Sequence, residues 1–336
     1  MSESSRTVDV SGSTGMIPVG APPPAGTPMP GASMLGASVL GVPSPVVRVE
    51  REFTVPQRSQ LSLVTHRFLR HRLAMGALAV LMVLIVLVFL GPVVFHLDYT
   101  AMSATLSAAP SFSFPMGTDG LGHNYLALVL RGAHQSLVIA FFVAAISSCV
   151  GAPYGTIAGY YGGKVDAIMM RIVDVILVLP FLVVVGALAE HFHGTWYTVA
   201  ILLGVTTWVV NARITRADVL SVKNKDFVEA ARALGASDMR IMFRHLLPNV
   251  TGALVVQTTL SVAAAILAEA GLSFVGLGIQ PPDTSLGLLA NQAANAIATR
   301  PWLFYSPCVM ILVICLCVNF IGDGLRDALD PRQVRR

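Results

Sequence analysis

Few residues in this sequence have the types and spacing that catalysis or metal binding requires. No serine, cysteine or acid pair forms a catalytic set. The segment Gly162–Val165 resembles the end of a phosphate-binding loop, but it lacks the first glycine and the final Ser or Thr. The cysteines lie inside apolar runs without zinc-like spacing; they are Cys149, Cys308, Cys315 and Cys317. The sequence therefore predicts a protein that is not an enzyme, has no metal site and does not bind ATP through a P-loop.

A charged segment between two apolar runs, Arg213–Pro248, is the part of the chain best suited to bind another protein. Asp226 followed by Glu229 resembles a capping box, in which two side chains satisfy the free N–H groups at a helix start. The alanines that follow favour helix. We therefore expect a short helix that begins near Phe227.

The same segment carries signals for a turn and a second helix. Gly235 suits the left-handed conformation that ends many helices. Ser237 or Asp238 can then cap a second helix that runs through Arg244, and Pro248 precedes the next apolar run. Two short helices with small side chains, held at the cytoplasmic membrane face, can lie in a groove on a partner protein.

One acidic residue lies inside an apolar run. Glu269 is the only charged residue in Val250–Phe274, and acidic side chains in such positions usually face protein or water. Two interpretations remain open: Glu269 lines a passage, or it caps a neighbouring segment. A proton relay is less favoured because no second deep acid or histidine accompanies it.

Two further spacings concern helix contacts. Gly151, Gly155 and Gly159 lie on one helix face, where small residues let another backbone come close. Helix packing is the preferred interpretation, and a pore-lining hinge is the alternative. Arg171 and Asp174 are spaced to pair on one face of a later helix.

The elements that must position these residues are membrane-spanning helices. Of the 336 residues, 54% are hydrophobic and 12% are charged, whereas soluble domains carry about 25% charged residues. An ordinary soluble enzyme is therefore excluded. Six apolar runs are candidate spans: Leu73–Phe95, Leu137–Tyr160, Ile168–Ala189, Trp196–Asn211, Val250–Phe274 and Trp302–Ile321.

Six spans place both ends of the chain on one side of the membrane. All of the 22 Lys and Arg residues except Arg131 and Arg300 fall on that side, which identifies it as cytoplasmic. Residues 1–60 are rich in Pro and Gly and lack an apolar period, so they predict a disordered cytoplasmic tail. Tyr99–Thr118 is free of charge, but its Ser, Thr and Pro content argues against a span.

The charged segment resembles the EAA motif of binding-protein-dependent ABC importer permeases. That pattern is Glu-Ala-Ala, three residues, Gly, nine residues and Ile-x-Leu-Pro. The positions that match in register are Glu229, Ala230, Ala231, Gly235, Leu247 and Pro248. His245 stands at the Ile position, and Arg244–Asn249 is similar to the peptide-importer branch.

Three other stretches are similar to the oligopeptide/dipeptide permease C subunits. Gly117–Gly122 resembles their GTDxLGRD segment, with His123-Asn124 in place of Arg-Asp. Leu272–Pro282 and Gly322–Arg332 resemble two later segments, although the usual Pro-Ser-Trp-Gly is Thr284–Gly287 here. The resemblance covers residues 60–336 and excludes the tail.

The resemblance implies an all-α integral membrane fold with six transmembrane helices of the type I ABC importer permease architecture. In such permeases the motif forms the coupling helix, which docks on an ATPase subunit. The positions carried over to this sequence are Asp226, Phe227, Glu229, Ala230, Ala231, Arg232, Leu234, Gly235, Ala236, Ser237, Leu247 and Pro248.

The resemblance also implies the function and the partners. This chain would be a permease subunit in the cell membrane that moves di- or oligopeptides inward by alternating access. Its partners would be a second homologous permease subunit of the B type, two cytoplasmic ATPase subunits that bind ATP and Mg, and an extracytoplasmic peptide-binding protein. No cofactor on this chain and no nucleic-acid partner are expected.

Other functions remain as alternatives. The family includes importers of nickel complexes and of glutathione, so the substrate class stays open. A secondary transporter driven by an ion gradient would need paired deep acids and a symmetric repeat, and the sequence shows neither. A membrane enzyme would need a catalytic cluster at the membrane surface, and none is visible.

Overall fold

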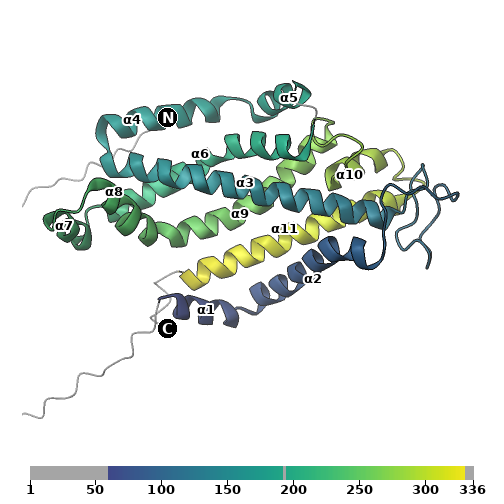
Figure 1. Ribbon diagram of the computed structural model, residues 1–336, viewed down its shortest axis with the longest axis horizontal. Coiled ribbons are helices and arrows are strands. Elements are labelled where there is room, and N and C mark those ends of the chain that lie inside the picture. The colour runs from purple at the N-terminus through teal and green to yellow at the C-terminus, as the bar shows by residue number, and fades with distance from the viewer. Residues whose placement is uncertain (1–59, 192–193, 330–336) are drawn as a thin grey trace, which may run out of the picture. The chain divides into compact units, whose positions relative to one another are not determined.

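The computed structural model describes residues 60–191 and 194–329, and every regular element in that part of the chain is a helix (Figure 1). The predicted tail therefore lies outside the described residues, apart from Gln60, as do residues 330–336. The helices are α1 (Gln60–Arg70), α2 (Arg72–Val94), α3 (Tyr125–Tyr161), α4 (Gly163–Val178), α5 (Phe181–His191), α6 (Trp196–Val222), α7 (Asp226–Ala233), α8 (Asp238–Arg240), the π-helical turn η1 (Ile241–Leu246), α9 (Leu247–Phe274), α10 (Leu286–Ala294) and α11 (Pro301–Leu329).

Five helices of the described chain are long and apolar enough to cross a membrane, and they correspond to five of the six predicted spans. The prediction that Ile168–Ala189 forms one helix is wrong, because the chain leaves helical geometry between α4 and α5. Leu179 has φ −67° and ψ 130°, since the ring of Pro180 disfavours the helical conformation in the residue before it.

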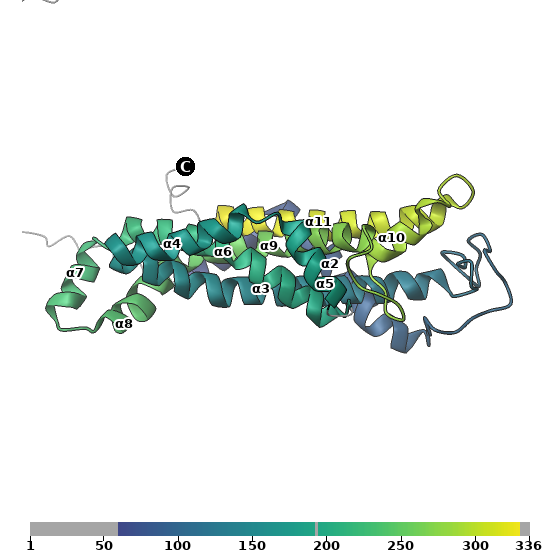
Figure 2. The ribbon, with the colours of Figure 1, turned by 90° about the horizontal axis from the view of Figure 1, so that it is seen from above.

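The two short helices α4 and α5 still carry the chain across the bundle. The start of α4 lies beside the end of α6, where Arg216 donates to Asp166. After α5 the chain has reached the opposite end, where the backbone N–H of Gln280 donates to the carbonyl oxygen of Gly194 at 3.1 Å. Within the described residues, five long helices run along the bundle, and the α4–α5 pair also leads from one end of it to the other (Figures 1 and 2).

Some helices extend well past their apolar runs. α3 has 37 residues, which is about 55 Å at 1.5 Å per residue, and it begins at Tyr125 rather than Leu137. The added turns carry Arg131, Gln135 and Ser136, whose polar groups are satisfied by protein contacts. The hydropathy falls there, but the helix continues because other segments cover those side chains.

The most extensive pairing of helices joins α3 to α6. A Cβ atom at Gly151 would lie 2.6 Å from the Trp208 carbonyl oxygen, and one at Gly159 would lie 2.9 Å from Cγ1 of Val219. Gly155 lies still closer to the backbone of α6. The glycines therefore face α6, as the packing interpretation requires.

Candidate functional site

The segment after α6 folds into a short helix, a turn and a second helical stretch. α7 begins at Asp226, with Lys225 at the N-cap position and no side-chain cap. The predicted capping box is therefore wrong, because Asp226 already occupies the first helical position. Asp226 and Glu229 still place negative charge in the first turn, where the helix dipole favours it.

α7 ends as the sequence predicts. Gly235 has φ +79°, and its N–H donates to the carbonyl oxygen of Arg232 at 3.0 Å. The N–H of Ala236 donates to the carbonyl oxygen of Ala231 at 3.1 Å, which completes a Schellman motif. The chain then turns into α8, with Ser237 at the N-cap position but without a side-chain hydrogen bond.

An apolar cluster holds this segment against the ends of three long helices. Its buried members are Val219 from α6, Val228 from α7, Ile241 and Leu246 from η1, and Val250 from α9. Tyr160 from α3 packs against them. Each buried aliphatic side chain contributes about 1.5–3 kcal/mol by leaving water. This group, which we name the cytoplasmic cluster, joins α7 to α3, α6 and α9.

The opposite side of the segment is open. Leu234 is 88% exposed and Met239 is 61% exposed. Large apolar side chains exposed next to charges are typical of a surface that binds another protein. Of the positions predicted to contact an ATPase, Ala231 is buried and Ala236 and Leu247 are partly buried, whereas Asp226, Phe227, Glu229, Ala230, Arg232, Leu234, Gly235, Ser237 and Pro248 are exposed.

Polar contacts that were not predicted from the sequence join the segment to α3. The Tyr160 hydroxyl donates to Oδ1 of Asp238 at 2.6 Å, and the guanidinium of Arg232 lies 5.9 Å from the Tyr160 ring centroid. The hydrogen bond with Tyr160 raises the pKa of Arg232 above its ordinary value, and the carboxylates of Asp238 and Glu229 add to the shift. No spacing pattern links Tyr160 to a segment so distant in sequence.

Two ion pairs hold α4 to α6. Nη2 of Arg216 lies 2.5 Å from Oδ2 of Asp166, and Arg213 pairs with Asp174. The prediction that Asp174 pairs with Arg171 on the same helix is wrong. α4 runs antiparallel to α6, so that Arg213 projects to the aspartate from the neighbouring helix.

Glu269 is fully buried and joins three elements. Its carboxylate accepts hydrogen bonds from the hydroxyls of Ser273 at 2.7 Å and Ser136 at 2.8 Å. Ser285, the N-cap residue of α10, also bonds to it. Within the described residues no three His, Cys, Asp or Glu side chains gather as a metal site. The arrangement fits the capping interpretation, because Glu269 fixes the start of α10 against α3 and α9.

The opposite end of the bundle contains Arg131 and Arg300. The guanidinium of Arg131 donates to both carboxylate oxygens of Asp283 at 3.0 and 3.1 Å, and it lies 5.2 Å from the centroid of the Tyr99 ring. Arg300 donates to Oγ of Ser107 at 2.5 Å. Both arginines therefore fasten irregular segments to the ends of long helices.

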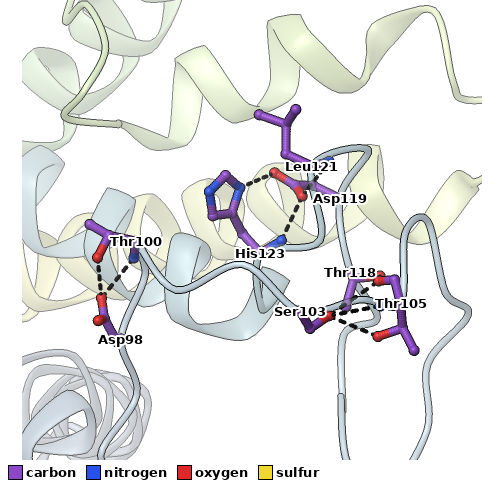
Figure 3. A network of polar contacts seen from close by, with 8 residues as sticks. All are labelled: Asp98, Thr100, Ser103, Thr105, Thr118, Asp119, Leu121 and His123. Carbon is purple, nitrogen blue, oxygen red and sulfur yellow. Dashed lines mark hydrogen bonds and ion pairs between the residues drawn. The ribbon is translucent and has the colours of Figure 1, made fainter.

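The segment between α2 and α3, residues 95–124, contains no helix, in agreement with its predicted exclusion from the spans. One oxygen of Asp119 accepts from the backbone N–H groups of Leu121 at 2.9 Å and His123 at 2.8 Å, and the other lies 2.7 Å from Nδ1 of His123 (Figure 3). Asn124 caps α3 through its side-chain oxygen. The His-Asn pair thus closes a turn and starts a helix.

Comparison with known proteins agrees with this architecture. The chain resembles an inward-facing MetNI methionine ABC transporter structure, with a TM-score of 0.52 and 21% sequence identity over 60% of this chain and 96% of that one. The likeness shows that the two chains share a fold.

The sequence comparisons define the family. The model described as "binding-protein-dependent transport system inner membrane component" matches residues 151–335, and the model of the N-terminal transmembrane domain of oligopeptide transport permease C matches residues 59–110. The chain therefore belongs to the binding-protein-dependent transport system inner membrane components.

Several relatives match most of the chain. The oligopeptide transport system permease protein OppC of Mycobacterium tuberculosis is 40% identical over 284 residues, which cover 83% of this chain and 97% of the relative. The dipeptide transport system permease protein DppC of Bacillus subtilis is 40% identical over 83% of this chain and 88% of its own length. The oligopeptide transport system permease protein OppC of Escherichia coli K12 is 39% identical over 83% of this chain and 93% of its own length.

Proposed function

We propose that this chain is the membrane-spanning permease subunit of an ATP-driven importer that carries di- or oligopeptides into the cytoplasm. Relatives that share about two fifths of its sequence are named oligopeptide or dipeptide transport permeases. Its partners are a second permease subunit of the B type, two ATPase subunits that bind ATP and Mg, and an extracytoplasmic peptide-binding protein. The chain itself performs no catalysis.

The proposed orientation places both termini in the cytoplasm. The distribution of Lys and Arg supports it. Arg131 lies near the start of α3 and Arg300 directly precedes α11, and these two helix starts lie at the end of the bundle opposite to α7 (Figure 1). Nε2 of His71 lies 3.5 Å from Oδ2 of Asp327, so the start of α2 and the end of α11 lie together.

The observation that carries the proposal is the two-sided construction of the α7–α8 segment. One side is buried in the cytoplasmic cluster, and the other presents exposed apolar side chains. When the ATPase subunits close on ATP, they displace this exposed side. The buried side passes the displacement to α3, α6 and α9, and the cavity turns outward to accept a peptide from the binding protein.

Changes on the exposed side test the docking role. Leu234→Asp and Glu229→Lys should each weaken recovery of the ATPase subunits with the purified permease by at least about tenfold, because central interface side chains carry much of the binding energy. ATP-driven uptake of trialanine into liposomes should fall in parallel. Leu106→Asp is the control, since Leu106 is 62% exposed in the segment between α2 and α3.

The result that contradicts the proposal is normal ATPase recovery and uptake in both variants. Uptake that persists without ATP and stops with a protonophore would instead identify an ion-coupled transporter. Competition by glutathione or a nickel complex, but not by di- or oligopeptides, would replace the proposed substrate class.

A further inference from the structure

We propose that Tyr160 is a positioning residue that ties the cytoplasmic end of α3 to the α7–α8 segment, so that movement of the segment reaches α3. The inference rests on the proposed function, in which that segment meets the ATPase. Beyond that function, Tyr160 is the side chain through which α3 is coupled to the segment.

Tyr160 contacts both short helices of the segment. Its hydroxyl donates to Asp238, the first residue of α8, at 2.6 Å. Its ring receives the guanidinium of Arg232 from α7 at 5.9 Å, a geometry in which a cation is attracted to the ring face. A tilt of α7 or a shift of α8 therefore acts on the same side chain of α3.

Tyr160 is also the contribution of α3 to the cytoplasmic cluster among the described residues. α6 and α9 are joined to the segment by the backbone itself, because α6 precedes it and α9 follows it through η1. α3 has no such covalent connection, and 78 positions separate Tyr160 from Asp238. The side-chain contacts of Tyr160 give α3 a direct link to the segment, beside the indirect one through its packing against α6.

A neighbouring contact fixes the end of α3 on its other side. Nζ of Lys223, at the end of α6, donates to the carbonyl oxygen of Gly159 at 3.0 Å. Cations favour such free carbonyl groups at the end of a helix. Gly159 and Tyr160 therefore hold the last turn of α3 between α6 and the α7–α8 segment.

The bond from Tyr160 to Asp238 is exposed in the isolated chain. A hydrogen bond to a charged group strengthens when water is excluded from it. An ATPase bound to the segment would exclude that water, so the hydrogen bond between Tyr160 and Asp238 is strongest in the complex with the ATPase. The contact is not part of the core, and its loss should leave the fold intact.

The experiment compares two adjacent tyrosines in the assembled transporter in liposomes. Tyr160→Phe removes the hydroxyl bond and keeps the ring. Tyr161→Phe is the matched control, because it removes the hydroxyl of the adjacent tyrosine, whose ring lies 5.2 Å from that of Tyr160. The readout is trialanine transported per ATP hydrolysed, together with recovery of the ATPase subunits and the thermal midpoint.

Tyr160→Phe should lower transport per ATP by about threefold or more, because hydrogen bonds to charged groups are worth more than neutral ones. ATPase recovery and the thermal midpoint should not change. Asp238→Ala should match this loss, whereas Asp238→Asn should cause a smaller loss, because its amide oxygen still accepts from the hydroxyl but carries no charge. Tyr161→Phe should behave as the unaltered chain.

Unchanged transport per ATP in Tyr160→Phe overturns the inference, and so does an equal loss in Tyr161→Phe. A lower thermal midpoint in Tyr160→Phe with a matching loss of transport would show a structural role instead. If the unaltered chain recovers no ATPase subunit, the proposed function fails, and this inference fails with it.

Discussion

At the scale of single residues, Glu269 shows how an acidic side chain is accommodated inside a long apolar helix. Its partners are serine hydroxyls, and two of the three accept backbone N–H groups in turn: Ser273 accepts from Ile279 at 3.3 Å and Ser285 accepts from Leu288 at 3.2 Å. Each hydroxyl hydrogen is therefore free to point at the carboxylate. The network is complete only while the acid is present.

Replacement of Glu269 should expose this dependence. Glu269→Ala leaves several buried hydroxyls without an acceptor and should lower the free energy of unfolding by about 3 kcal/mol. Glu269→Gln keeps one acceptor oxygen and should cost about 1 kcal/mol. The thermal midpoint of the purified subunit measures both. A stable Glu269→Ala variant that no longer transports would favour a role in lining a passage.

Sequence reasoning predicts individual residues unevenly. Gly235 was predicted because its left-handed conformation is a local backbone requirement. The capping box was wrong by one position, because the distinction between an N-cap residue and a first helical residue depends on the entering chain. Tyr160 was not predicted, since its partners come from a distant segment.

At the scale of elements, the close contact between α3 and α6 depends on glycines, which have no side chain to separate the two helices. Gly155→Ala should destabilise the protein by about 1–3 kcal/mol, because a Cβ there meets the backbone of α6 and forces the helices apart. Gly76→Ala in α2 is the matched control, since its Cβ would find nothing within 4 Å. That change should be neutral or stabilise by up to about 1 kcal/mol. Thermal unfolding of both variants tests this prediction. Equal unfolding midpoints for Gly155→Ala and Gly76→Ala would contradict the packing role of Gly155.

Helix bounds were predicted well where the apolar run sets them. α2 and α11 begin within one residue of their predicted starts, because basic or proline residues bound those runs. The start of α3 was missed because its outer turns are polar and are covered by other segments. The break between α4 and α5 was missed because the apolar run continues through Pro180.

At the scale of the whole molecule, the proposed topology can be tested from outside the cell. In a chain whose native cysteines are replaced, Phe112→Cys should react with an impermeant maleimide on intact cells, because Phe112 is fully exposed between α2 and α3. Leu234→Cys should react only after permeabilisation, as a cytoplasmic position. The reverse pattern would invert the orientation and remove the proposed ATPase contact.

The interruption of the third pass has a consequence for what surrounds the chain. α4 has 16 residues and ends about 24 Å from its start, so the break falls part of the way along the bundle, where the last carbonyl groups of α4 have no partners in their own helix. Hydrocarbon cannot satisfy them, and Leu179 is 49% exposed in the isolated subunit. We therefore expect another polypeptide or water to reach this spot in an assembled transporter, so that this side of the bundle would not face the bilayer.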